Sequence, residues 1–476
     1  MVFSSSIFLL YFLPIFLIFY YATDRNYKNY ILLLASIFFY TWGEPWFIFV
    51  ILSSTFLDYH IVNGLYLAKT KRRKNIFLIL SISTNLGLLL FFKYAGFFIE
   101  NINVILGGLG IGEITVVKIG LPIGISFYTF QTLTYSIDIY RGIHRPLKRV
   151  SDYMMYILMF PQLVAGPIVR FNEIADQITD RSHYETIDYK LHGFFRFVIG
   201  LAKKVLIANA MGAEADRMFS LHASELTTQL AWLGILAYAF QIYFDFSGYS
   251  DMAIGIGRMI GFHFPENFNN PYVSQSITEF WRRWHMTLGR WMKDYLYIPM
   301  GGNRVKSKAM LYFNLWFVFL VSGLWHGAAW NFIIWGAYHG LFLIADRLFL
   351  LKFYKKIGQW PSILITFIIT LVGWVIFRAE SFTQVFEYSG KMFAFEFTAS
   401  PVVFSIKFWT VLLISAVFSF LTAFPFGLNF EKRVFYTGIQ RVAGVSIMSI
   451  ISLILLIISV SSITTSGFNP FIYFRF

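Results

Sequence analysis

Two histidines lie in stretches whose residues could carry out chemistry. His326 is in the middle of SGLWHGAAWNF (residues 322–332), within an apolar segment that begins near residue 310 and continues past residue 344. A titratable ring in such a segment needs a partner, a cavity or a chemical role. The second, His285, lies in FWRRWHMTLGRWMKDYLYIPMGGNR (residues 280–304), where tryptophans are interspersed with arginines. An apolar environment keeps imidazole neutral, which is the form that a general base or a nucleophile requires.

Each histidine also has a structural interpretation. A single histidine in a membrane helix can simply form a hydrogen bond to a neighbouring helix. The Trp and Arg side chains of residues 280–304 would equally suit anchoring at a membrane interface. The presence of two such histidines, one of them beside basic residues that could hold an anion, favours the chemical interpretation. No HExxH or comparable spacing is present, so we expect no metal site.

The composition indicates a membrane protein that crosses the bilayer many times. Of its 476 residues, 57% are hydrophobic and 13% are charged, whereas a soluble domain has about 25% charged residues. The net charge of +14 is typical of cytoplasmic loops rich in Lys and Arg, such as KTKRRK (residues 69–74), and we expect no nucleic-acid binding. The absence of cysteine excludes a thiolate metal site and a cysteine nucleophile.

Apolar runs predict an all-α polytopic protein with about eleven to thirteen membrane helices, some of them re-entrant. The runs fall near residues 5–22, 29–43, 46–66, 76–99, 121–140, 151–168, 193–210, 228–246, 309–325, 327–349, 361–379, 404–424 and 443–462. No linker divides them, which favours a single membrane domain over residues 1–476. Polar residues gather between residues 121 and 340, among them Asp245 and Asp251, which we expect to line the interior or to cap a helix, without a catalytic role.

Two local patterns should position the histidines. Residues 280–295 predict one helix with an aromatic stripe of Trp281, Trp284, Leu288, Trp291 and Tyr295. It carries too many cations to span the membrane, so it should lie at the interface or dip into a protein-lined pocket. In the second pattern, Gly323 and Gly327 are four residues apart, as are Gly336 and Gly340. Such spacing lets helices approach closely, which places His326 in or beside a tight crossing.

Several of these stretches together are specific enough to suggest a family. They are ITEFWRRWHMTLGRWMKDYLYIPMGGNR, GLWHGAAWNFIIWGAYHG, LPIGISFYTFQTLTYSIDIYRG, FPQLVAGPIVRF, YFDFSGYSDMAIGIG and the opening MVFSSSIFLLYFLPIFLIFYY. Through them the sequence resembles the membrane-bound O-acyltransferase (MBOAT) family, in its bacterial branch of alginate and peptidoglycan O-acetylation proteins. The resemblance covers nearly the whole chain. It implies a ring-like fold around a central funnel, with the catalytic core at about residues 121–350.

The resemblance also implies an active site and a reaction. The catalytic histidine of the family falls on His326, and the second signature position falls on His285. The implied reaction is acetyl transfer from cytoplasmic acetyl-CoA, with no bound cofactor, across the bacterial inner (cytoplasmic) membrane to a cell-surface glycan. His326 would act as general base or would take the acetyl group as acetyl-imidazole. His285 would orient the acyl group, bond to His326 or hold the carbonyl oxygen.

Further binding residues and partners belong to the same set of expectations. Arg282, Arg283, Lys293 and Arg304 would bind the phosphates of the donor or dock a partner, and Asn331 lies near His326 in sequence. Expected partners are acetyl-CoA, membrane lipid and a periplasmic acetyltransferase that completes the transfer to alginate-like exopolysaccharide or peptidoglycan. Two alternatives stay open: D-alanyl-type acyl transfer from a carrier protein, and a non-enzymatic transporter.

Overall fold

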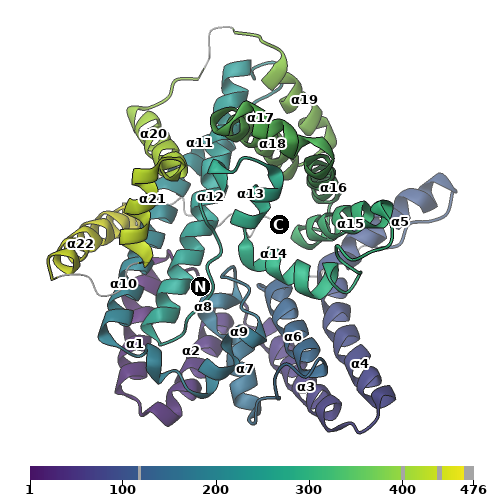
Figure 1. The fold of residues 1–476 in the computed structure, drawn as a ribbon, viewed down its shortest axis with the longest axis vertical. Coiled ribbons are helices and arrows are strands. Elements are labelled where there is room, and N and C mark those ends of the chain that lie inside the picture. Colours follow the sequence, from purple (N-terminus) through teal and green to yellow (C-terminus); the bar gives the residue numbers. More distant parts are fainter. Residues whose placement is uncertain (116–119, 398–401, 437–441, 466–476) are drawn as a thin grey trace. The chain divides into compact units, whose positions relative to one another are not determined.

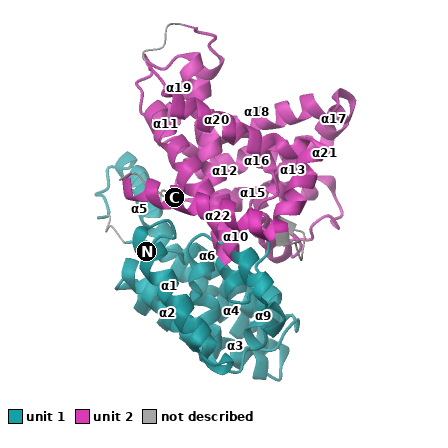
Figure 2. Ribbon diagram, turned by 90° about the vertical axis from the view of Figure 1, so that its left-hand side faces the viewer, with its two compact units in different colours: residues 1–193, 256–265 teal, residues 194–255, 266–476 magenta. Residues whose placement is uncertain are grey.

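The computed structural model describes residues 1–115, 120–397, 402–436 and 442–465, and within them the chain is helical and contains no strand. It forms two compact units (Figure 2): residues 1–193 with 256–265, and residues 194–255 with 266–476. The division falls within the helices α10 (Ile187–Ala202) and α12 (Thr228–Met259). The all-α prediction is confirmed for this part of the chain. The single membrane domain, with its core at about residues 121–350, stays a prediction.

The first unit is built from helices of very different length (Figure 1). Its helices are α1 (Leu13–Ala22), α2 (Lys28–Gly43), α3 (Phe47–Leu67), α4 (Lys71–Leu89), α5 (Ala95–Gly108), α6 (Ile125–Tyr140), α7 (Val150–Leu158), α8 (Phe160–Leu163) and α9 (Phe171–Thr179). The π-helical segments η1 (Phe8–Phe12) and η3 (Leu90–Tyr94) adjoin α1 and α4.

A cluster of buried polar side chains, joined by hydrogen bonds, connects α3, α4 and α7 in this unit. One carboxylate oxygen of Asp58 accepts hydrogen bonds from Ser81 Oγ at 2.5 Å and from Asn85 Nδ2 at 2.9 Å. The other accepts a hydrogen bond from the Tyr153 hydroxyl at 2.6 Å. A buried carboxylate is tolerated only when its oxygens are paired in this way.

The second unit contains the stretches that carry the two candidate histidines. Its helices are α11 (Asn209–Phe219), α13 (Ile277–Arg283), α14 (Met286–Met292), α15 (Lys308–His326), α16 (Trp330–Ala345), α17 (Leu351–Ile357), α18 (Gln359–Arg378), α19 (Phe382–Phe393), α20 (Ile406–Phe420), α21 (Pro425–Glu431) and α22 (Val442–Thr465). Four π-helical segments extend these helices: η5 (Lys203–Ala208), η7 (Lys293–Tyr297), η8 (Asp346–Leu350) and η10 (Lys432–Tyr436).

Eight helices among the described residues are long and apolar enough to cross a membrane. They are Phe47–Leu67, Lys71–Gly108, Thr228–Met259, Lys308–His326, Trp330–Ile357, Gln359–Arg378, Ile406–Ala423 and Ala443–Thr465. The multi-pass prediction is therefore confirmed. The expected runs near residues 121–140 and 151–168 form shorter helices, α6 and the pair α7 and α8.

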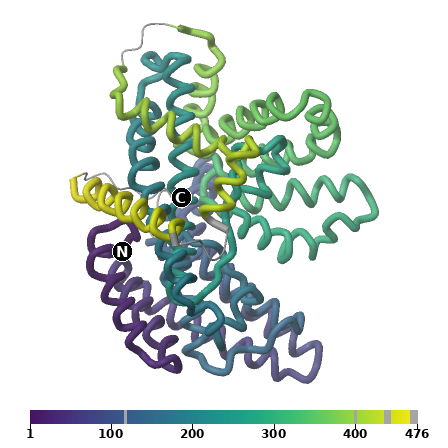
Figure 3. Tube along the Cα trace, turned by 60° about the vertical axis from the view of Figure 1, so that its left-hand side comes forward, coloured from purple at the N-terminus to yellow at the C-terminus, as the bar shows by residue number. Residues whose placement is uncertain are grey.

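Glycines bring α15 and α16 into direct backbone contact, and both helices belong to the green part of the trace in Figure 3. A Cβ atom added to Gly323 would lie 2.2 Å from the carbonyl oxygen of Phe332, and one on Gly336 would lie 2.3 Å from that of Phe319. No side chain fits in this space. The close crossing predicted from the glycine spacing is confirmed, and His326 ends the helix that forms it.

The crossing predicts a stability difference between two glycine substitutions. Gly336→Ala forces its new methyl group against a backbone carbonyl, so it should lower the free energy of unfolding by about 1–3 kcal/mol. Gly390→Ala, in α19, is the matched control, because an added Cβ there meets nothing within 4 Å. A helical glycine costs about 0.5–1 kcal/mol relative to alanine, so the control should be neutral or stabilising. Thermal unfolding in detergent measures both; equal melting temperatures for Gly336→Ala and the wild type would contradict the tight crossing.

Candidate active site

The segment around His285 is not the continuous helix that the aromatic spacing predicts. Helix α13 ends at Arg283, Trp284 is extended (φ −98°, ψ 131°), and His285 adopts the left-handed conformation (φ 44°, ψ 52°) before α14 begins at Met286. Figure 1 shows two separate short helices here. The left-handed conformation costs a residue with a Cβ about 1–2 kcal/mol, so other interactions must hold His285 in place. Strain of this kind is common at functional sites.

The start of α13 is fixed by two acceptors. Ser276 Oγ accepts a hydrogen bond from the Glu279 amide at 3.1 Å, as an N-cap does. The carboxylate of Asp346, from η8, accepts hydrogen bonds from the amide of Thr278 at 2.7 Å and from its hydroxyl at 2.8 Å. Negative charge at a helix N-terminus is also favoured by the helix dipole. The N-terminal end of α13, the helix that precedes the break at His285, is therefore held in place.

His285 is buried among aromatic rings and held at one nitrogen. Its Nδ1 lies 3.0 Å from Oδ1 of Asn267. The Phe246 ring packs edge-on at 4.8 Å, and the Trp325 ring lies at 6.0 Å, between ring centroids. Burial lowers the pKa of His285 from its ordinary 6.5 to about 3, so the ring is neutral at physiological pH. The other nitrogen, Nε2, is buried and has no hydrogen-bond partner among the described residues.

His326 ends α15 inside a box of three aromatic rings. Trp325, Trp335 and Phe377 meet its ring edge-on, at centroid distances of 5.0, 5.1 and 5.4 Å. Only 7% of His326 is exposed. Because the Trp325 ring contacts both His326 and His285, the structure brings the two predicted catalytic residues into one aromatic cluster. Their catalytic roles stay a prediction.

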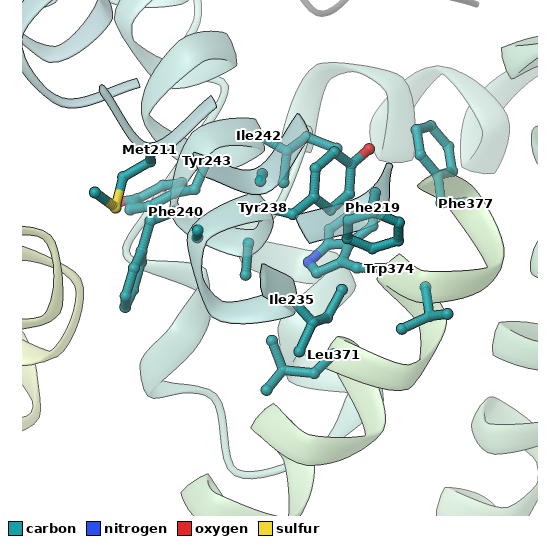
Figure 4. Close-up of a cluster of buried hydrophobic side chains, with 14 of the residues drawn as sticks. Met211, Phe219, Ile235, Tyr238, Phe240, Ile242, Tyr243, Leu371, Trp374 and Phe377 are labelled. Carbon is teal, nitrogen blue, oxygen red and sulfur yellow. The ribbon is translucent and has the colours of Figure 1, made fainter. Parts of the chain in front are cut away.

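A large hydrophobic core packs against this aromatic cluster. In Figure 4, Leu371, Trp374 and Phe377 of α18 gather with Ile235 and Tyr238 of α12, and all five are buried. Since Phe377 also contacts His326, the histidine rests directly on this core. Close-packed aromatic side chains have little freedom to move, so the position of the imidazole is well defined.

The other predicted binding residues lie in different environments. The amide nitrogen of Asn331 donates a hydrogen bond to the carbonyl oxygen of Ala379 at 3.1 Å, so this side chain ties α16 to the end of α18. Arg283 forms an ion pair with Glu279 at 2.8 Å, one helical turn earlier. The remaining cations, Arg282, Lys293 and Arg304, are exposed. They are free to meet a charged ligand but do not form the walls around the histidines.

A third histidine, His339, belongs to the same aromatic cluster and was missed from the sequence. It is fully buried in α16, with ring centroids 5.0 Å from Trp281 and 5.1 Å from Trp335. Neither of its ring nitrogens has a partner among the described residues. Because His326 and His339 are thirteen residues apart in the sequence, the sequence did not predict that they belong to one aromatic cluster. The signal that could have shown it is the one-turn spacing of Trp335 and His339 on α16.

A cavity of about 490 Å³ adjoins the residue that holds His285. Its walls are mostly apolar and come mainly from α10, α12 and α20 to α22, and they include Asn267. Five charged residues are among the described residues that line it, and four of them form ion pairs: Arg196 lies 2.7 Å from both Asp251 and Glu266, and Lys203 lies 2.6 Å from Asp251. Asp251 thus has the interior position predicted for it. Asn267 therefore both lines the cavity and contacts His285.

The burial of His285 predicts acid sensitivity. The pKa of His285 is about 3 in the folded protein and about 6.5 in the unfolded chain. At a pH between these two pKa values, the imidazole is protonated in the unfolded chain and neutral in the folded protein. Stability should therefore fall as pH drops below about 6.5, with about 1.4 kcal/mol per pH unit coming from this group. His285→Asn keeps a hydrogen-bond donor for Asn267 but removes the titratable ring, so it should weaken the dependence of stability on pH. Thermal unfolding between pH 7.5 and 5 measures this, with the exposed His222→Asn as control; parallel curves for wild type and His285→Asn would contradict it.

Comparison with known proteins identifies the family of this chain. Residues 149–383 match the family described as MBOAT, membrane-bound O-acyltransferase family. The probable alginate O-acetylase AlgI of Pseudomonas aeruginosa is 45% identical over 396 residues, covering 83% of this chain and 75% of that protein. The peptidoglycan O-acetyltransferase of Helicobacter pylori is 38% identical over 415 residues, covering 80% and 77%. The teichoic acid D-alanyltransferase of Bacillus subtilis is 29% identical over 278 residues, covering 55% and 69%.

The family match includes both candidate histidines and the helices that hold them. The similarity to the Pseudomonas aeruginosa protein extends over most of both chains. On this evidence, and with eight apolar helices in the described part of the chain, the protein belongs to the membrane-bound O-acyltransferase family and is a multi-pass membrane O-acyltransferase.

Proposed function

We propose that this enzyme takes an acetyl group from cytoplasmic acetyl-CoA and passes it across the bacterial inner membrane for O-acetylation of a cell-surface glycan. The observation that carries the proposal is the pair of buried histidines, His285 and His326, that contact the same tryptophan in an O-acyltransferase. Two relatives at 45% and 38% identity bear the names of an alginate O-acetylase and a peptidoglycan O-acetyltransferase. Both names support an exopolysaccharide like alginate, or peptidoglycan, as the glycan.

His326 is the general base of the proposed reaction. Its imidazole takes the proton of the acceptor hydroxyl while the hydroxyl oxygen attacks the carbonyl carbon of the thioester. The carbon–sulfur bond then breaks, the acetyl group stays on the oxygen, and coenzyme A leaves as a thiol after receiving a proton. The aromatic box around His326 supports this role, since it excludes water that would otherwise hydrolyse the thioester.

The donor is proposed to be acetyl-CoA rather than an acylated carrier protein. The D-alanyltransferase relative is 29% identical and matches 55% of this chain, whereas the acetyl-transferring relatives match 80% or more. The exposed Arg282, Lys293 and Arg304 are the cations offered for the phosphates of coenzyme A. Arg283 is a weaker candidate for binding these phosphates, because the ion pair with Glu279 already neutralises its charge.

A periplasmic acetyltransferase is the proposed partner. His326 lies inside a packed aromatic cluster, where a glycan chain has no access. A small acceptor hydroxyl or a side chain of a partner can enter such a site, and a polysaccharide cannot. The partner would receive the acetyl group and transfer it to the glycan outside the membrane.

The proposal extends to the architecture. We infer a ring of helices around a funnel that reaches His326 from the cytoplasm, with about eleven to thirteen membrane segments in all. Helices α13 and α14 have seven residues each, so each is about 10 Å long and far too short to cross a hydrocarbon core of about 30 Å. Together with the exposed cations beside them, this length supports a re-entrant segment.

The test is release of coenzyme A thiol from acetyl-CoA by the purified protein in nanodiscs, with a partner extract and a glycan mixture added in turn to supply the acceptor hydroxyl. Wild type should release thiol, and His326→Ala should lose about 10²–10⁴-fold of that rate, the usual contribution of a positioned base. His222→Ala, at an exposed histidine, is the matched control and should keep full activity. Thermal unfolding confirms that each variant is folded.

Other outcomes separate the alternatives. Equal thiol release by wild type and His326→Ala would make His326 structural. Activity with an acylated carrier protein and none with acetyl-CoA would identify the D-alanyl-type reaction. Rapid denaturation at neutral pH followed by mass spectrometry distinguishes a general base from a nucleophile, because only the nucleophile leaves an acetyl group on His326, and acid would hydrolyse that acetyl-imidazole.

A further inference from the structure

The loop at Asn267 supplies the support that the break before α14 needs. The carbonyl oxygen of Asn267 accepts a hydrogen bond from the amide of Met286 at 2.9 Å. Its side-chain oxygen, Oδ1, accepts hydrogen bonds from the amide of Thr287 at 3.3 Å and from the Thr287 hydroxyl at 2.8 Å. These are the first two amides of α14, which a helix cannot satisfy internally. Asn267 therefore caps α14 from a distant part of the chain, in place of the residue at the cap position, His285.

The same contacts decide which atom of the Asn267 amide faces His285. A backbone N–H can only donate, so the Asn267 atom that meets the Thr287 amide must be the oxygen. The other atom, Nδ2, donates to Ser250 Oγ at 3.0 Å. Every polar atom of this fully buried side chain is therefore used, and its orientation is fixed.

The fixed oxygen determines the tautomer of His285. Oδ1 of Asn267 is an acceptor, and His285 Nδ1 lies 3.0 Å from it, so Nδ1 must carry the hydrogen. In a neutral imidazole the second nitrogen then carries a lone pair and no hydrogen. That nitrogen, Nε2, is buried and has no partner among the described residues.

We propose that Asn267 is a positioning residue of the active site, which holds His285 as the Nδ1–H tautomer and makes its Nε2 a hydrogen-bond acceptor. This inference rests on the proposed function, and it narrows the role of His285. An acceptor cannot donate to the carbonyl oxygen of the thioester, so His285 does not form the oxyanion site. Instead it accepts a hydrogen bond from an N–H or O–H group at the reacting centre.

The tautomer can be tested without any substrate. Nitrogen-15 NMR of histidine-labelled protein in nanodiscs separates the two neutral tautomers, and His285→Asn identifies the signal of His285 by difference. The expected signal is a neutral ring with hydrogen on Nδ1 in the wild type and a changed signal in Asn267→Ala. A wild-type signal with hydrogen on Nε2 would overturn the proposal.

Kinetics test the positioning role in the reaction itself. Asn267→Ala should lower kcat for thiol release about 10–100-fold, the usual effect of removing a residue that orients a functional histidine, with little change in KM for acetyl-CoA. Asn267→Asp keeps an acceptor for both His285 and Thr287 and should restore most of the activity. Its negative charge stabilises the imidazolium form of His285, so the acidic limb of the pH profile of kcat/KM should move to higher pH.

A neighbouring asparagine gives the matched control. Asn269 lies two residues away on the same loop and is exposed, so Asn269→Ala should match the wild type in rate and pH profile. An unchanged pH profile in a folded, active Asn267→Asp variant would overturn the proposal. If the wild type releases no thiol from acetyl-CoA, the proposed function has failed, and the NMR signal alone then decides whether Asn267 sets the tautomer.

Discussion

The constraint on which this structure depends is that polar groups within an apolar protein must find their partners inside the chain. The ion pairs of α12 show it most clearly. Asp245 pairs with Lys204 at 2.8 Å, and Asp251 pairs with Lys203 at 2.6 Å. Removing one member of such a buried pair typically costs about 3–5 kcal/mol. The helices can approach closely enough to form these pairs because Gly200 meets the backbone of α12, where a Cβ atom would lie 2.5 Å from the Gly248 carbonyl oxygen.

The same constraint explains why the break at His285 is possible. Ending one helix and starting another exposes amide and carbonyl groups that water would normally satisfy. Here the amide of Asn269 donates to the carbonyl of Arg283, and Asn267 receives the first amides of α14. The loop of residues 266–270 therefore stabilises both ends of the break. A left-handed histidine is tolerated because this loop satisfies the groups that surround it.

Local patterns in the sequence predicted most of the membrane helices and the crossing of α15 and α16. Hydrophobic runs of sufficient length and glycines four residues apart are local signals, and they act over one or two helices. The break between Trp284 and His285 was not predictable in this way, because the aromatic spacing continues through it. Its cause is a long-range contact with Asn267, eighteen residues earlier, which no local pattern shows. His339 was missed for a related reason: its significance comes from packing against Trp281, a residue of another helix.

The positions of the two histidines on their helices suggest a division of roles. His285 stands at the N-terminal end of α14 and His326 is the last residue of α15. A helix carries partial positive charge at its N-terminus and partial negative charge at its C-terminus. A proton gained during the reaction is therefore better accommodated on His326 than on His285. Together with the proposed Nδ1–H tautomer, this asymmetry supports the proposal that His326 takes the proton and that His285 stays neutral, as an acceptor that orients its neighbours. Two residues of the same type can thus serve one reaction differently because their backbone settings differ.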